Sequence, residues 1–404
     1  MNEHNLEKLW NQILFNRVNC IVKEAMIAEN VEAWLITSSE YNEDPLFRSL
    51  SGYFDYHSRG VSAYMMILKD NRFYAYSINK IDSSNSPYIY LKDNMDLDDF
   101  VQNICNIHNI SKISLQISDI TSINSGLSYS HFKILDKLTK KINIKFVSSD
   151  LLSTRVMTTR HRFEKEYYQI LSKDTELILD EAFNNIYKYT NTNDIEYELV
   201  RLAKKKGYSL WFKPDVCIQR MGLKKSRNFN CDIKDGDLIH VDFGVSNILN
   251  TDVQRLYYLE GFKKMPKSFE QGFKEALKVQ SLICELLNKR NCGNEVLKEV
   301  LNRTNKLDIK AQVYTHPLGF HGHGAGSAVG RYHSLGKSIK QGEYNIFYPS
   351  TYAIESNSSK EIPEWNNQLV YFFTEEDYWL DENSSCFLSD RAKSIKKLEY
   401  NKLR

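Results

Sequence analysis

The chain has 404 residues, more than one hydrophobic core usually holds, so two domains are expected. Its 53 Lys and Arg against 51 Asp and Glu give a net charge of +2, which offers no electrostatic basis for binding nucleic acid or a membrane surface. The seven cysteines are scattered without a CxxC pair, which indicates reduced thiols rather than a disulfide framework or a zinc cluster. The N-terminal stretch MNEHNLEKLWNQILFNR has no apolar run long enough for a signal peptide or a membrane span, so we expect a soluble cytoplasmic protein.

The first 150 residues predict a compact α/β domain. Apolar residues recur at helical spacing over 5–30, and VEAWLIT (31–37) is typical of a buried strand. Alternating residues over 62–78 predict a hairpin that turns at Lys-Asp-Asn. A helix over 97–109 and strands over 112–118 and 142–150 complete a unit of alternating strands and helices.

From residue 151 to the C-terminus the pattern changes to long helices and antiparallel strands. Amphipathic helices are predicted over 162–190, 194–207 and 268–289. The β segments between and after them are LIHVDFG, RLYYLEGF, NIFYPSTYAIES and QLVYFFTEEDYWL. This mixture predicts an α+β domain.

Asp242 and Asp252 lie ten residues apart in DGDLIHVDFGVSNILNTDVQR, on two predicted β segments. If these segments form an antiparallel hairpin centred on Asn247, the two aspartates lie directly opposite each other on one face. Their neighbours are apolar, and two like charges at such a position repel. A buried carboxylate without a partner is costly, so a bound cation is the simplest compensation.

The segment HPLGFHGHGAG (316–326) places three histidines and four glycines in eleven positions. Glycine permits close approach of the backbone, and clustered imidazoles are typical of metal binding or proton transfer. A glycine-rich surface loop with incidental histidines is the alternative interpretation. The carboxylates elsewhere in the chain favour the first.

Two further carboxylates end apolar segments, Glu355 in TYAIE and Glu375 after VYFFT. Each alone would be interpreted as an exposed residue at a strand end. With Asp242, Asp252 and one histidine they make an oxygen-rich set that suits Mn²⁺, Co²⁺, Fe²⁺ or Zn²⁺ rather than a thiolate-bound metal. Four carboxylates carry enough charge for two divalent ions.

This order of Asp, Asp, His, Glu and Glu resembles the pita-bread metallopeptidases: methionine aminopeptidase, Xaa-Pro aminopeptidase, prolidase and creatinase. DGDLIHVDFG with TDVQR is similar to their paired-Asp hairpin, HPLGFHGH to their His-x-x-Gly-x-x-x-His segment, and TYAIE and TEED to their two metal-binding glutamates. EAWLITSSEYNEDPLFRSLSG resembles the N-terminal domain of the Xaa-Pro aminopeptidase and creatinase branch. The resemblance implies a smaller creatinase-like α/β domain over 1–150 and an α+β pita-bread catalytic domain over 151–404.

The resemblance also implies roles for individual residues. Two divalent ions, with Mn²⁺ as the first expectation, would be bound by the five matching residues, Asp242, Asp252, His316, Glu355 and Glu375. Glu355 would also be the general base, and His323 would donate a hydrogen bond to the tetrahedral intermediate. His321 would be structural or would support a ligand. The implied reaction is hydrolysis of a C–N bond that releases an N-terminal residue before proline from a small peptide, in a homodimer.

Three departures from the family pattern affect the predicted substrate more than the predicted metal. The interval between the aspartates is ten where the family usually has eleven. Lys225 stands near the position of a substrate-binding histidine, and Phe373 stands where an arginine is often found. Two alternatives therefore stay open: a creatinase-like or biosynthetic enzyme with a non-peptide substrate, and a non-catalytic binding or scaffold protein on the same fold.

Overall fold

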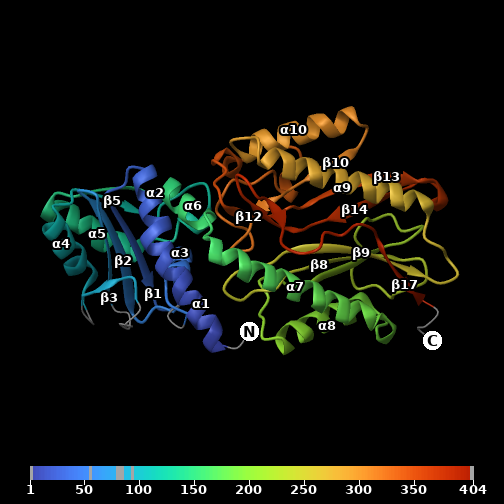
Figure 1. Cartoon of the computed structure of the whole chain (residues 1–404), viewed down its shortest axis with the longest axis horizontal. Helices are drawn as coiled ribbons and strands as arrows, with labels where there is room; N and C mark the ends of the chain where they lie inside the picture. The colour runs from blue at the N-terminus through green and yellow to red at the C-terminus, as the bar shows by residue number, and fades with distance from the viewer. Residues whose placement is uncertain (1–2, 54–56, 79–85, 92–94, 401–404) are drawn as a thin grey trace. The chain divides into compact units, whose positions relative to one another are not determined.

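The computed structural model describes residues 3–53, 57–78, 86–91 and 95–400 (Figure 1). The chain divides into two compact units, Met1–Glu164 and Lys165–Arg404. This division comes after residue 150, the boundary expected from the sequence, because helix α6 (Asp150–Thr158) packs against α2 (Lys23–Ala28) and α3 (Pro45–Ser49). Within the described ranges, no helix is long and apolar enough to cross a membrane.

A six-stranded sheet forms the centre of the first unit, in the order β4-β3-β2-β1-β5-β6. Strand β1 (Ala33–Ser39) is antiparallel to β2 (Val61–Lys69) and parallel to β5 (Lys112–Leu115). The hairpin between β2 and β3 (Arg72–Ile78) turns at Asp70 and Asn71, whose positive φ values are typical of a tight two-residue turn. The remaining strands are β4 (Ile89–Tyr90) and β6 (Lys145–Ser148).

Alternate side chains of this sheet point to opposite faces, and helices cover both. Leu35 and Met65 pack under α4 (Leu97–His108) and α5 (Tyr129–Ile142). On the other face lie α1 (Glu3–Asn16), the π-helical turn η1 (Arg17–Val22) and α2 (Figure 1). The sequence prediction of an α/β unit is confirmed.

In the second unit, strands lie between two pairs of helices (Figure 1). Helices α7 (Arg162–Asn184) and α8 (Thr192–Lys205) lie on one side, and α9 (Lys267–Leu287) and α10 (Gly293–Lys306) on the other. Phe269 and Phe273 of α9 are buried against Phe372, so the apolar stripe of this helix packs directly on the strands. This is the α+β pita-bread arrangement that the resemblance implies.

Three sheets make up the strands of this unit within the described residues, in the orders β17-β9-β8-β7, β10-β13-β14 and β11-β12-β15-β16. Their bounds are β7 (Asp215–Gln219), β8 (Leu238–Phe243), β9 (Val253–Glu260), β10 (Lys310–Val313), β11 (His316–Pro317), β12 (Ser350–Ala353), β13 (Ser356–Ile362), β14 (Gln368–Thr374), β15 (Asp377–Leu380), β16 (Cys386–Phe387) and β17 (Lys396–Glu399).

Candidate metal centre

The five predicted ligands meet where the chain repeatedly passes between sheets. Between β10 and β11, between β12 and β13, and between β14 and β15, the chain crosses between the same two sheets. His316 begins β11, Glu355 lies between β12 and β13, and Glu375 lies between β14 and β15. The sequence predicted one β segment through Glu355 and another through Glu375, and the structure divides each of them into two strands. Each break places a carboxylate at the junction.

The third sheet contributes the aspartates, in a register that differs from the expected one. Asp242 pairs with Gln254 across β8 and β9, so the prediction that Asp242 lies directly opposite Asp252 is wrong. The turn is centred on Ile248 rather than Asn247, because Ser246 bridges Asn250 and the Thr251 N–H donates to the Val245 carbonyl. Asp252 therefore lies two residues closer to the turn than the partner of Asp242.

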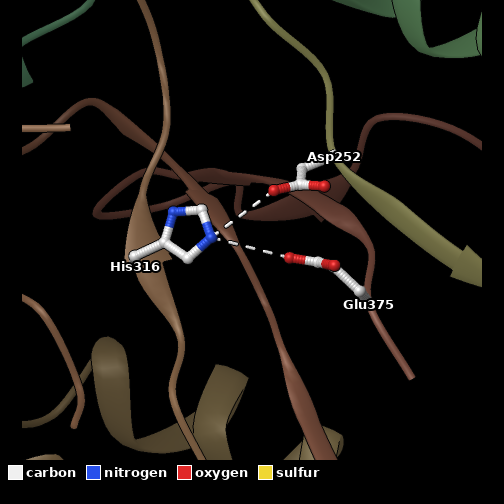
Figure 2. Close-up of side chains that lie close together, drawn as sticks. All are labelled: Asp252, His316 and Glu375. Carbon is white, nitrogen blue, oxygen red and sulfur yellow. Dashed lines mark ion pairs between the residues drawn. The ribbon is translucent and has the colours of Figure 1, made fainter. Parts of the chain in front are cut away.

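Despite this shift, the five side chains form one cluster. His316 Nε2 lies 3.5 Å from Asp252 Oδ2 and 3.6 Å from Glu375 Oε1 (Figure 2). It lies 4.0 Å from Glu355 Oε2. Two overlapping groups have ligand atoms close enough to hold an ion: Asp252, His316 and Glu375, and Asp242, Glu355 and Glu375. Glu375 belongs to both groups.

Burial and like charge shape the protonation of this cluster. Burial, and then the charge of Glu375, raise the pKa of Asp242, Asp252 and Glu355 well above the usual range. Burial alone would lower the pKa of His316, but its ion pair with Glu375 and the charges of the nearby carboxylates outweigh burial and raise it. Without a cation, the carboxylates of the cluster therefore keep their protons to higher pH than exposed carboxylates do.

The unsatisfied atoms of the cluster fit a divalent metal. Asp242 Oδ1, Asp252 Oδ1, His316 Nε2 and Glu375 Oε1 are buried and have no hydrogen-bond partner among the described residues. The His316 Nδ1–H donates to the Pro317 carbonyl at 3.1 Å, which leaves Nε2 as the free donor atom that a metal ligand needs. Carboxylate oxygens with one imidazole nitrogen suit Mn²⁺, Co²⁺, Fe²⁺ and Zn²⁺.

A buried polar frame holds the ligands in place, and sequence reasoning missed most of it. Asp377 accepts from the Asp252 N–H at 2.9 Å and from the Ser172 hydroxyl at 2.8 Å. Arg255 forms an ion pair with Glu376 at 2.8 Å and donates to the Glu375 carbonyl. The acidic triplet that starts at Glu375 is buried, so it is part of the site rather than a solvated strand end.

His323 lies beside the cluster. Its ring contacts that of His316 edge to face, with centroids 4.7 Å apart, and that of Trp211, at 5.3 Å. Partial desolvation by its neighbours, followed by the charges of His316 and Arg331, lowers the pKa of His323 to about 4, although part of the side chain stays exposed. The ring is therefore neutral at physiological pH, in the form that donates one hydrogen bond.

Trp211, which the sequence analysis missed, explains one glycine of the histidine-rich segment. A Cβ on Gly322 would lie 2.3 Å from the indole ring, so only glycine fits between Trp211 and the loop. The indole N–H donates to the Thr251 carbonyl at 3.0 Å, one residue before Asp252. Trp211 thus joins the His323 loop to the β8–β9 turn.

The departures from the family pattern fall on different parts of the site. Lys225 is exposed, and the cation next to Asp242 is Arg227, which pairs at 2.9 Å with Asp215, the residue opposite Asp242 on β7. Phe373 is buried and stacks on His240, with ring centroids 4.3 Å apart. His240 in turn contacts Gln254, so Phe373 is connected through His240 to the residue opposite Asp242.

A known protein family matches the part of the chain that holds most of this site. Residues 167–362 match the profile of metallopeptidase family M24. This match assigns the segment 167–362 to the M24 metallopeptidase family. Four of the five predicted ligands lie within the matched residues, and Glu375 follows them. A search of curated protein sequences found no match.

Several solved structures share the fold over nearly the whole chain. The X-Pro aminopeptidase from Thermotoga maritima MSB8 matches with a TM-score of 0.66 and 15% identity, over 93% of this chain and 100% of its own. The Xaa-Pro dipeptidase from Bacillus anthracis matches with 0.63 and 14%, over 96% and 100%. The N-terminal domain of the FACT complex subunit SPT16 from Cicer arietinum matches with 0.61 and 9%, over 95% and 97%. At these identities the likeness shows the fold alone.

Proposed function

We propose that this M24 protein is a dinuclear metal-dependent hydrolase that cleaves a C–N bond, releasing the N-terminal residue of an Xaa-Pro peptide. The observation that carries the proposal is the buried cluster, in which four ligand atoms lack any described partner. An apolar or hydrogen-bonded core would be more stable than such a set, so its retention favours ion binding. Mn²⁺ is the first candidate, and Co²⁺, Zn²⁺ and Fe²⁺ suit the same donors.

Divalent ions in this cluster would supply a nucleophilic water at neutral pH and polarise the scissile carbonyl. Asp242, Asp252, His316, Glu355 and Glu375 would hold them. Glu355 would accept the proton of the attacking water at a carboxylate oxygen and deliver it to the leaving nitrogen. Neutral His323 would donate a ring N–H to the oxyanion that develops on the substrate carbonyl.

A homodimer in the cytoplasm, acting on small peptides, completes the proposal. The family and the names of the neighbours support this choice of substrate, since the neighbours include an X-Pro aminopeptidase and an Xaa-Pro dipeptidase. Light scattering tests the assembly, because a particle of 47.3 kDa, the mass of one chain, would contradict the dimer.

The experiment that tests the function is a hydrolysis screen of Xaa-Pro dipeptides and longer Xaa-Pro peptides with added Mn²⁺ or Co²⁺. We expect release of the N-terminal residue, abolished by EDTA and restored by metal. Hydrolysis of dipeptides alone would identify a dipeptidase. Metal binding without hydrolysis of any Xaa-Pro substrate would favour the creatinase-like alternative, and absence of metal binding would favour a scaffold.

A further inference from the structure

Gln254 contacts two of the predicted metal ligands but is not one of them. It is buried on β9, directly opposite Asp242. Its side-chain amide donates to Glu355 Oε1 at 2.5 Å and to Glu375 Oε2 at 2.8 Å. One NH₂ group therefore contacts both glutamates, which come from different strand junctions.

The oxygens that Gln254 binds are not the ones that face the imidazole. His316 Nε2 lies near the other oxygen of each glutamate, Glu375 Oε1 and Glu355 Oε2. Glu375 Oε1 is one of the buried atoms without a partner. By occupying the outer oxygens, the amide turns the inner oxygens toward the space that an ion would fill.

The two carboxylates determine the orientation of the amide, because an ionised carboxylate can only accept a hydrogen bond. Gln254 Oε1 lies 2.9 Å from His240 Nε2, and a carbonyl oxygen can only accept, so His240 carries its proton on Nε2. A flipped amide would place its oxygen against two carboxylate oxygens, which have no hydrogen to donate. The neutral His240 ring then accepts at Nδ1, where the Cys217 thiol lies at 3.4 Å.

We infer that Gln254 is a positioning residue for the metal ligands Glu355 and Glu375, and that His240, stacked on Phe373, locks its amide in the donating orientation. The inference rests on the proposed metal binding and deepens it. It also gives Phe373 a role, since this residue provides the flat apolar surface on which His240 lies. Hydrogen bonds of this kind fix the direction of a ligand's lone pairs, and their loss typically costs about 10- to 100-fold in metal affinity.

Titration calorimetry of the metal-free protein with Mn²⁺ tests the inference. Gln254→Met keeps the length of the side chain and removes its two donors, so the Kd for Mn²⁺ should rise about 10- to 100-fold. His240→Phe keeps the aromatic stack and removes the N–H that bonds the amide oxygen, together with the contact to Cys217, so a smaller rise is expected. Cooperative thermal unfolding of each metal-free variant, followed by circular dichroism, shows that it is folded.

Gln219→Met is the matched control. Gln219 is also buried, on strand β7 of the same sheet, and its hydrogen bonds go to the N–H and the carbonyl of Tyr371. This variant should lose stability but keep the wild-type Kd. A Gln254→Met protein that binds Mn²⁺ within twofold of wild type would overturn the inference alone. A wild-type protein that binds no Mn²⁺ would overturn the proposed metal centre and this role with it.

Discussion

The two neighbouring histidines differ in what their rings contact, although they lie only seven residues apart in the chain. His316 donates from Nδ1 to a backbone carbonyl and directs Nε2 at three carboxylates. His323 meets aromatic rings on two sides and has a lowered pKa. Their surroundings therefore favour different roles, a metal ligand and a neutral donor to substrate.

Separate substitutions of these histidines distinguish the two roles. His316→Ala should lower both metal occupancy and turnover, because it removes the only imidazole nitrogen of the ligand set. His323→Ala should keep its metals and lose about a hundredfold or more in kcat, the usual cost of one donor to an oxyanion. Metal analysis and steady-state rates on both variants check this. Loss of metal from His323→Ala alone would show that the roles are reversed.

A buried carboxyl in the first unit predicts a pH effect on stability. Burial raises the pKa of Asp44 to about 7 from an ordinary value of 3.8, although Oδ1 accepts from the Leu46 N–H that it caps. Between these two values the folded state holds a proton that the unfolded state has released. The free energy of unfolding should therefore fall as pH rises through this window, by up to about 4 kcal/mol in total.

Asp44→Asn tests this effect, since asparagine can also cap the helix but does not titrate. Denaturant unfolding of the full chain in EDTA between pH 4 and 8 should show a weaker pH dependence in the variant than in wild type. Parallel curves for the two proteins would show that Asp44 does not titrate in this range.

At the scale of elements, the sequence allowed the clustered side chains to be predicted but not how the strands present them. The alternation of apolar residues identified β8 and β9, and the even spacing placed both aspartates on one face. The register depended on the turn, where the Ser246–Asn250 bridge moves the centre of the hairpin by one residue. The contacts of Gln254 and Trp211 with residues far along the chain could not be predicted, because no local pattern records them.

The fit of Trp211 against Gly322 leads to a prediction about the histidine-rich loop. Gly322→Ala places a Cβ against the indole ring, and overpacking of this kind typically costs about 1–3 kcal/mol of unfolding free energy. In a Trp211→Leu background the same substitution should cost less, because the ring that the Cβ meets is gone. Denaturant unfolding of the four proteins gives the coupling energy. Equal costs in both backgrounds would show that the loop clashes elsewhere.

For the whole molecule, fold alone does not separate catalysis from scaffolding. Peptidases and the FACT subunit domain match this chain over similar lengths and with similar TM-scores. A catalytic protein and a scaffold on this fold must differ in the side chains of the site. In this chain, the buried carboxylates predict that stability differs with and without a bound cation. Their mutual repulsion destabilises the metal-free chain, and a bound cation would relieve it.

Metal should therefore stabilise the second unit, and its removal should make stability depend on pH. Mn²⁺ at a hundred times its Kd should add about 2.7 kcal/mol to the free energy of unfolding of this unit for each site that it fills. In EDTA, the raised pKa values of Asp242, Asp252 and Glu355 mean that the folded state holds more protons than the unfolded state above about pH 4, so stability should fall as pH rises toward neutrality.

Asp252→Asn, which removes one charge, should be at least as stable as wild type in EDTA at pH 7 and should respond less to Mn²⁺. Thermal unfolding of both proteins with EDTA and with Mn²⁺ measures each effect. A wild-type protein whose unfolding temperature is the same in both would bind no ion at this cluster, and the scaffold interpretation would then hold.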